Sequence, residues 1–186
     1  RTYESDTIPV ICLEEIFDEV EVLRQIERLK YLGHLELPVK TGINSLIATI
    51  LEPEHFYVLD PGLSYTEAML YIADRLIQEG VLDRSFKEAL LKREEKSTML
   101  FDENIGFPHL QYPGEKIILA VGAADRTKPG VRFLLFLALP QTAELNDDIL
   151  IHIYNELLVI ASDELLVKEI AGLRSGSEFV RYMIRN

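Results

Sequence analysis

The sequence predicts an α/β fold in which helices cover both faces of a mixed β-sheet. Two runs, residues 117–123 (IILAVGA) and 131–139 (VRFLLFLAL), are almost wholly apolar, which is typical of central strands that are covered on both faces. A short loop containing Pro129 and Gly130 joins them, and this favours an antiparallel hairpin over a crossover. Helical patterns alternate with strands before these runs and fill the chain after them, as in layered α/β folds.

Helix boundaries are marked by capping residues. After a predicted strand at 56–59 and an Asp-Pro-Gly turn, Ser64 and Glu67 have the spacing of a capping box, and Gly80 ends the helix that they begin. Asp83 is expected to cap the next helix. Three further helices are expected in the C-terminal part, with the following starts: Asn146 or Asp147, Asp163, and a second capping box formed by Ser175 and Glu178.

The N-terminal part is less regular. Residues 7–13 are expected to form a strand, and the apolar residues that follow recur at helical spacing until Gly33. These apolar residues are Ile16, Val20, Leu23, Ile26 and Leu29. Residues 34–55 contain Pro38, Gly42 and Pro53, which indicate a connector, with a short apolar helix or strand at 43–51.

Composition excludes several classes of function. The chain has 186 residues and a net charge of −12, so we expect no direct contact with nucleic acid or an anionic membrane. The charge would suit a positively charged protein partner, or serve solubility alone. No apolar run reaches the length of a membrane span, and we expect no signal peptide because the first residues are polar. The single Cys12 fits a reducing compartment and an apolar core position. We expect a cytoplasmic protein, and because the chain starts with Arg1 in place of Met, we expect a fragment or processed chain that other domains could precede.

The stretch with chemical content is residues 93–109, REEKSTMLFDENIGFPH. Pro108 fixes its own φ and biases Phe107 toward an extended backbone, so His109 should lie at the end of a stiff segment. Gly106 permits a close approach of the backbone to a neighbour. A histidine after proline is more often a surface residue, and Arg93 at a helix C-terminus could simply offset the helix dipole.

This stretch resembles the phosphotransferase-system enzyme IIA domains of the mannitol/fructose class. Those domains share an Arg-Glu pair at a helix end and an Ile-Ala-(Ile/Val)-Pro-His run, which align here with Arg93-Glu94 and with residues 105–109. The resemblance covers residues 56–182 and implies the enzyme IIA fold, with His109 accepting a phosphoryl group from the carrier HPr and passing it to a IIB domain. It implies that Arg93 pairs phosphoryl oxygens, and that Glu94, Gly106 and Pro108 support the site. Glu94 could orient Arg93, or it could simply be solvated. No metal or other cofactor is expected.

The sequence departs from the family pattern at three positions. Asp102 stands where glycine is usual, and Gly106 where alanine is usual. Active relatives carry a second histidine at the start of the helix after the last strand, where the alignment places Leu150. We expect Leu150 to contact the His109 ring and His152, two residues away, to point elsewhere. Without a second histidine, a sensor or degenerate role gains weight. The remaining histidines, His34, His55 and His152, are expected to be ordinary surface or packing residues.

Residues 1–35 resemble, more weakly, the last strand and helix of a IIB-like domain. In transcriptional regulators that also carry helix-turn-helix and phosphotransferase regulatory (PRD) domains, IIB-like and IIA-like domains stand together at the C-terminus. The expected organisation is therefore a IIB-like remnant at 1–35, a connector at 36–55 and a IIA domain at 56–186. An added helix packed on the IIA domain is the alternative for 1–35.

The expected function is a phosphoacceptor domain of a sugar-responsive activator or antiterminator, which could dimerise through the full-length protein. The alternatives are a stand-alone sugar-uptake phosphocarrier and a non-phosphorylated interaction module.

Overall fold

A five-stranded mixed sheet forms the centre of the protein. The computed structural model describes residues 45–127, 129–141 and 146–185. The strands, in chain order, are β1 (Phe56–Val58), β2 (Ile105–Gly106), β3 (His109–Tyr112), β4 (Ile118–Ala123) and β5 (Phe133–Pro140). The strand predicted at 7–13 and the helix predicted after it lie outside the described residues.

The spatial order of the strands is β1-β4-β5, with β2 and β3 both along the far side of β5. β4 and β5 pair in antiparallel fashion, as the short connection predicted. The pairs β1–β4, β2–β5 and β3–β5 are parallel. The predicted mixed sheet is therefore confirmed, and the edge that carries His109 is opposite the edge formed by β1.

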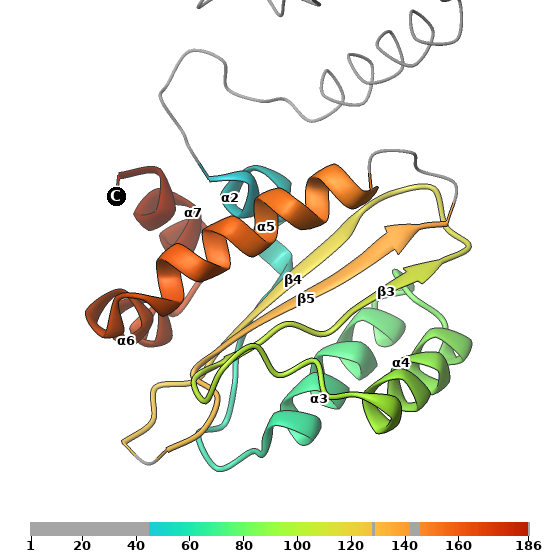
Figure 1. The fold of residues 1–186 in the computed structure, drawn as a ribbon, viewed down its shortest axis with the longest axis horizontal. Coiled ribbons are helices and arrows are strands. Elements are labelled where there is room, and N and C mark those ends of the chain that lie inside the picture. Colours follow the sequence, from blue (N-terminus) through green and yellow to red (C-terminus); the bar gives the residue numbers. More distant parts are fainter. Residues whose placement is uncertain (1–44, 128, 142–145, 186) are drawn as a thin grey trace, which may run out of the picture.

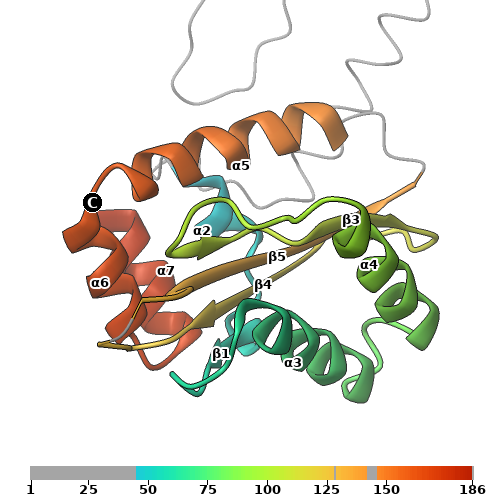
Figure 2. The same ribbon diagram turned by 60° about the horizontal axis from the view of Figure 1, so that its bottom comes forward.

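Helices cover both faces of this sheet (Figure 1). One face packs on α3 (Tyr65–Gln78) and α4 (Arg84–Lys96), and the other on α2 (Leu46–Ile50), α5 (Asn146–Ala161), α6 (Glu164–Gly172) and α7 (Gly176–Arg185). Figure 2 shows the sheet between the two helical layers. The strands alternate their side chains between two buried clusters, because successive strand residues point to opposite faces. The α/β sandwich predicted from the sequence is thus the fold observed.

The predicted caps begin the helices with one variation. Ser64 and Glu67 form both halves of the capping box at α3. Asp83 accepts from Phe86 N at α4, and Asp163 accepts from the first amides of α6. At α7, Ser175 accepts from the amide of Glu178, whereas the Glu178 carboxylate accepts from Arg174 N rather than from Ser175 N.

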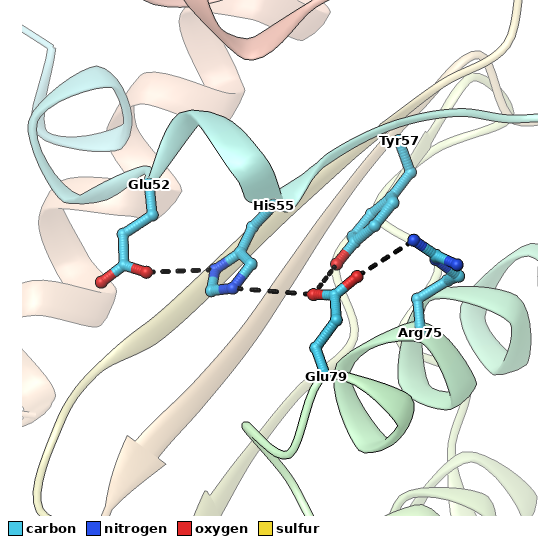
Figure 3. A network of polar contacts seen from close by, with 5 residues as sticks. All are labelled: Glu52, His55, Tyr57, Arg75 and Glu79. Carbon is cyan, nitrogen blue, oxygen red and sulfur yellow. Dashed lines mark hydrogen bonds and ion pairs between the residues drawn. The ribbon is translucent and has the colours of Figure 1, made fainter.

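A polar network fixes the β1 edge to α3 (Figure 3). His55, which ends a short 3-10 turn (Pro53–His55), is buried with its two ring nitrogens 3.9 Å from Glu52 and 4.0 Å from Glu79. The Tyr57 hydroxyl donates to Glu79 at 3.0 Å, and Arg75 forms an ion pair with the same carboxylate. The packing role expected for His55 agrees with this position, which is at the sheet edge away from His109.

Within the described parts of the chain, no helix has both the length and the apolar character needed to cross a membrane.

Candidate functional site: the segment of His109

The sheet edge positions His109. β2 and β3 keep one register along β5, since Ile105 pairs with Phe133 and His109 pairs with Leu137. The edge strand is interrupted at Phe107 and Pro108, because proline has no N–H to donate and the Phe107 amide turns to Met99 O at 2.9 Å. Pro108 O accepts from Leu137 N at 2.9 Å. Hydrogen bonds to Met99 and Leu137 therefore hold the segment before His109. This agrees with the stiff segment that Pro108 predicted.

One hydrogen bond determines the tautomer of the His109 ring. Nδ1 lies 2.8 Å from the carbonyl oxygen of Phe107. A carbonyl oxygen only accepts, so the neutral imidazole carries its proton on Nδ1. The lone pair is then on Nε2, which is the nitrogen able to act as a nucleophile.

Burial keeps this ring neutral. Desolvation lowers the pKa of His109 below the ordinary histidine value, the hydrogen bond to Phe107 opposes that effect, and the positive charge of Arg93 lowers the pKa further. His109 is therefore an uncharged imidazole at neutral pH. A nucleophile needs its lone pair, so the environment favours attack by Nε2.

Two aromatic rings hold the imidazole. Phe107 stacks on it with centroids 4.6 Å apart, and Tyr154 of α5 meets it edge-on at 6.0 Å. Tyr154 also meets Phe107 edge-on at 5.1 Å. Sequence reasoning did not identify Tyr154. The sequence feature that could have indicated it is an aromatic residue one turn after Leu150, on a helix that is otherwise largely aliphatic.

His152 and Leu150 lie on different flanks of α5. His152 lines a groove with Glu156 and Ser45, away from the flank that carries Tyr154, so it points elsewhere as expected. Leu150 is partly buried and packs on the core between the sheet and α5. A direct contact between Leu150 and the His109 ring stays a prediction, and Tyr154 is the α5 side chain seen against that ring.

Arg93 lies in the last turn of α4, where its Nη1 donates to Ser97 O at 2.9 Å. This is a helix C-terminal contact, the simpler of the two interpretations of the sequence. The same guanidinium is close enough for its charge to lower the pKa of His109. One side chain can therefore end α4 and contribute positive charge beside the candidate nucleophile.

Glu94 ties the loop before β2 to α3. Its Oε2 accepts from Met99 N at 2.8 Å and from the Tyr65 hydroxyl at 3.2 Å. Met99 in turn contacts the His109 backbone, since His109 N lies 3.4 Å from Met99 Sδ. Burial and the adjacent Glu94 charge raise the pKa of Tyr65, which therefore remains a hydrogen-bond donor. Neither Tyr65 nor Met99 was identified from the sequence.

Two departures from the family pattern have local physical reasons. A Cβ added at Gly106 would lie 2.6 Å from Cε2 of Tyr65, so the Tyr65 ring occupies the space that an alanine would need. Asp102 Oδ1 accepts from Asn104 N and Ile105 N, both at 2.7 Å. The carboxylate thus shapes the turn into β2, where a glycine would rely on backbone freedom alone.

Among the described residues, no cluster of three or more His, Cys, Asp or Glu side chains could hold a metal ion. The groups described around His109 are the rings of Phe107 and Tyr154, the Met99 thioether, the charge of Arg93 and backbone groups. This arrangement fits the positioning of a phosphoryl group on an imidazole, since such transfer depends on orientation and charge neutralisation.

Comparisons with known proteins agree with this fold. The nitrogen regulatory protein IIA-Ntr of Neisseria meningitidis is similar over 75% of this chain and 99% of its own length, with a TM-score of 0.57 and 19% identity. The mannitol IIA of Escherichia coli is similar over 72% and 98%, with a TM-score of 0.54 and 17% identity. No curated protein sequence matches significantly. The sequence profile of the phosphoenolpyruvate-dependent sugar phosphotransferase system, EIIA 2, matches residues 49–186, so the chain belongs to this family of type 2 IIA domains.

Proposed function

We propose that the chain accepts a phosphoryl group on Nε2 of His109 from phosphorylated HPr, as the regulatory domain of a sugar-responsive transcriptional regulator. The observation that carries the first part is the hydrogen bond of 2.8 Å from Nδ1 to Phe107 O, which leaves the Nε2 lone pair available. Membership of the EIIA 2 family supplies the chemical class.

The transfer needs no base from the protein. The Nε2 lone pair of His109 attacks the phosphorus of the donor phosphohistidine, the donor P–N bond breaks, and its electron pair stays on the donor ring. The Nδ1 proton remains in its hydrogen bond to Phe107 O, which stabilises the positive character that the ring acquires. Arg93 offers a planar fork for two phosphoryl oxygens, at the cost of its contact with Ser97 O.

An exposed apolar stripe on α5 offers a docking surface for the donor. Beside Tyr154, which is 38% exposed, the side chains of Ile151 and Leu158 are 56% and 58% exposed. IIA domains of this family interact with HPr and other components of the system, so HPr, a IIB domain, or both are the proposed partners. The net charge of −12 favours a partner with a basic face and no direct contact with nucleic acid. This exchange would take place in the cytoplasm.

The presence of Leu150 in place of a second histidine favours the regulatory role over a role in sugar uptake. A leucine cannot donate to a phosphoryl oxygen, so the phosphorylated form lacks one contact that the resemblance assigns to working phosphocarriers. The proposed domain limits are a IIB-like remnant at 1–35, a connector at 36–55 and the IIA domain at 56–186, in a regulator that dimerises through its other domains. A stand-alone phosphocarrier is the second candidate, favoured by the neutral nucleophile.

Onward transfer separates these roles. The chain is phosphorylated with phosphoenolpyruvate, enzyme I and HPr, freed of them, and mixed with IIB domains of the mannitol and fructose systems. We expect the phosphate to stay on the chain or to return only to HPr. Rapid loss to a IIB domain would establish the phosphocarrier, and failure to gain phosphate would establish a non-phosphorylated interaction module.

A further inference from the structure

A groove lies on the flank of α5 that faces away from Tyr154. Its lining comes from α5, α6, α7 and the start of α2, and its volume is about 410 Å³. The residues that matter below are Ser45, Glu156, Val159, Ile160, Leu166 and Met183. Four of the eight lining residues are polar, His152 and Asn155 among them, but most of the exposed lining surface is apolar. We name this feature the α5–α7 groove.

α5 is unusually apolar on its outward side. Val159 in the groove is 65% exposed, in addition to the stripe of Ile151 and Leu158 beside the His109 site. A helix that is apolar around most of its circumference is normally covered by other structure. The stripe near His109 has a proposed partner already, whereas the α5–α7 groove is on another flank and needs a different occupant.

The chain itself enters the described structure at this groove. Ser45, the first described residue, is among the lining residues. Glu156 fixes this entry point: its carboxylate accepts from Ser45 Oγ at 2.9 Å, from Ile47 N at 3.4 Å, and from Leu46 N. The described part of the chain therefore begins at the mouth of the groove.

We propose that residues 14–32 dock in the α5–α7 groove as an amphipathic helix. The apolar positions from Ile16 to Leu29 form one stripe about 20 Å long at 1.5 Å per residue, comparable with the roughly 24 Å of α5. The stripe needs an apolar surface to bury, and the groove supplies one. Residues 33–44 can span roughly 40 Å when extended, which is ample for the helix to fold back.

Because residues 14–32 belong to the same chain, their binding in the α5–α7 groove is favoured over the binding of a separate molecule. A short connection gives the segment an effective concentration in the millimolar range, so even weak apolar contacts suffice for docking. The docked helix would hold whatever precedes it against α5 while leaving the His109 side of the same helix open to HPr. The inference does not depend on the proposed phosphorylation.

Amide hydrogen exchange of the full chain tests the proposal. We expect residues 16–29 to be protected in the wild type, and Val159→Glu to lower that protection about tenfold or more because it places a charge in the groove. Protection of β4 and β5 should stay unchanged, since Val159 is exposed. The matched control is Ile151→Glu on the same helix, which should leave the protection of residues 16–29 as in the wild type.

Three outcomes would overturn the proposal. Residues 16–29 could exchange freely in the wild type, or their protection could survive Val159→Glu. Their protection could also rise with protein concentration, which would assign the groove to a second copy of the chain. Phosphorylation of Val159→Glu by HPr, measured in parallel, should match the wild type, so failure of this proposal and failure of the proposed function can be told apart.

Discussion

The contact between Gly106 and Tyr65 offers a sharp test of how the His109 segment is held. Gly106→Ala places a Cβ 2.6 Å from Cε2 and 2.9 Å from Cδ2 of Tyr65. Ordinary carbon contacts need about 3.5–4.0 Å, so the ring must retreat by roughly 1 Å. The Tyr65 hydroxyl is 3.2 Å from Glu94, near the limit of a hydrogen bond, and this shift would break it.

The expected change in stability combines two costs and one gain. Overpacking typically costs about 1–3 kcal/mol, and loss of a hydrogen bond to a charged group costs about 1.5–3 kcal/mol. The reduced entropy of the unfolded chain returns about 0.4–1 kcal/mol. We therefore expect Gly106→Ala to lower the free energy of unfolding by about 1.5–5.5 kcal/mol, measured by urea denaturation.

A double-mutant cycle isolates the contact. In a Tyr65→Ala background the ring is gone, so Gly106→Ala should cost less than about 0.5 kcal/mol. Gly172→Ala is the matched control, because a Cβ there meets no atom within 4 Å and should be neutral or stabilising. Equal costs of Gly106→Ala in both backgrounds would refute the reasoning.

Two substitutions and one titration address the chemistry. Arg93→Lys should keep the fold but slow phosphorylation by HPr roughly 10–100-fold, the kinetic equivalent of about 1.5–3 kcal/mol; unchanged rates would remove Arg93 from the site. In an NMR titration the pKa of His109 should lie below 6.5. Because the unfolded chain then takes up a proton first, His109 should contribute a loss of stability as the pH falls below that value; a pKa above 6.5 would contradict the burial argument. Leu150→His should lengthen the lifetime of the phosphorylated form or speed its onward transfer, and identical kinetics would place position 150 outside the phosphoryl site.

Much of the fold was predictable because its signals are local. The apolar runs that became β4 and β5 are long enough to exclude other interpretations, and their short connection determined the antiparallel pairing. Ser64, Asp83 and Asp163 begin the helices that they were predicted to begin. The strand β3 was missed because the alternation of polar and apolar residues in His109–Tyr112 extends over only four residues, and its pairing with β5 depends on tertiary register.

The site was predictable only in part. The pattern around His109 and Arg93 was enough to propose them as site residues, but it cannot show which side chains approach from other elements. Tyr154 reaches the His109 ring from α5, and Tyr65 of α3 reaches Glu94 of α4 and Gly106 of β2. The role of Leu150 stays a prediction, because alignment placed it on the helix without determining its contacts.

Direct observation of the phosphorylated nitrogen tests the central claim. The full chain is incubated with phosphoenolpyruvate, enzyme I and HPr, and the product is examined by mass spectrometry and by phosphorus and nitrogen NMR at neutral pH. The structure predicts one acid-labile phosphoryl group on Nε2 of His109, absent from His109→Ala, with His34, His55 and His152 unmodified. Phosphate on Nδ1, or equal incorporation by His109→Ala, would contradict the account.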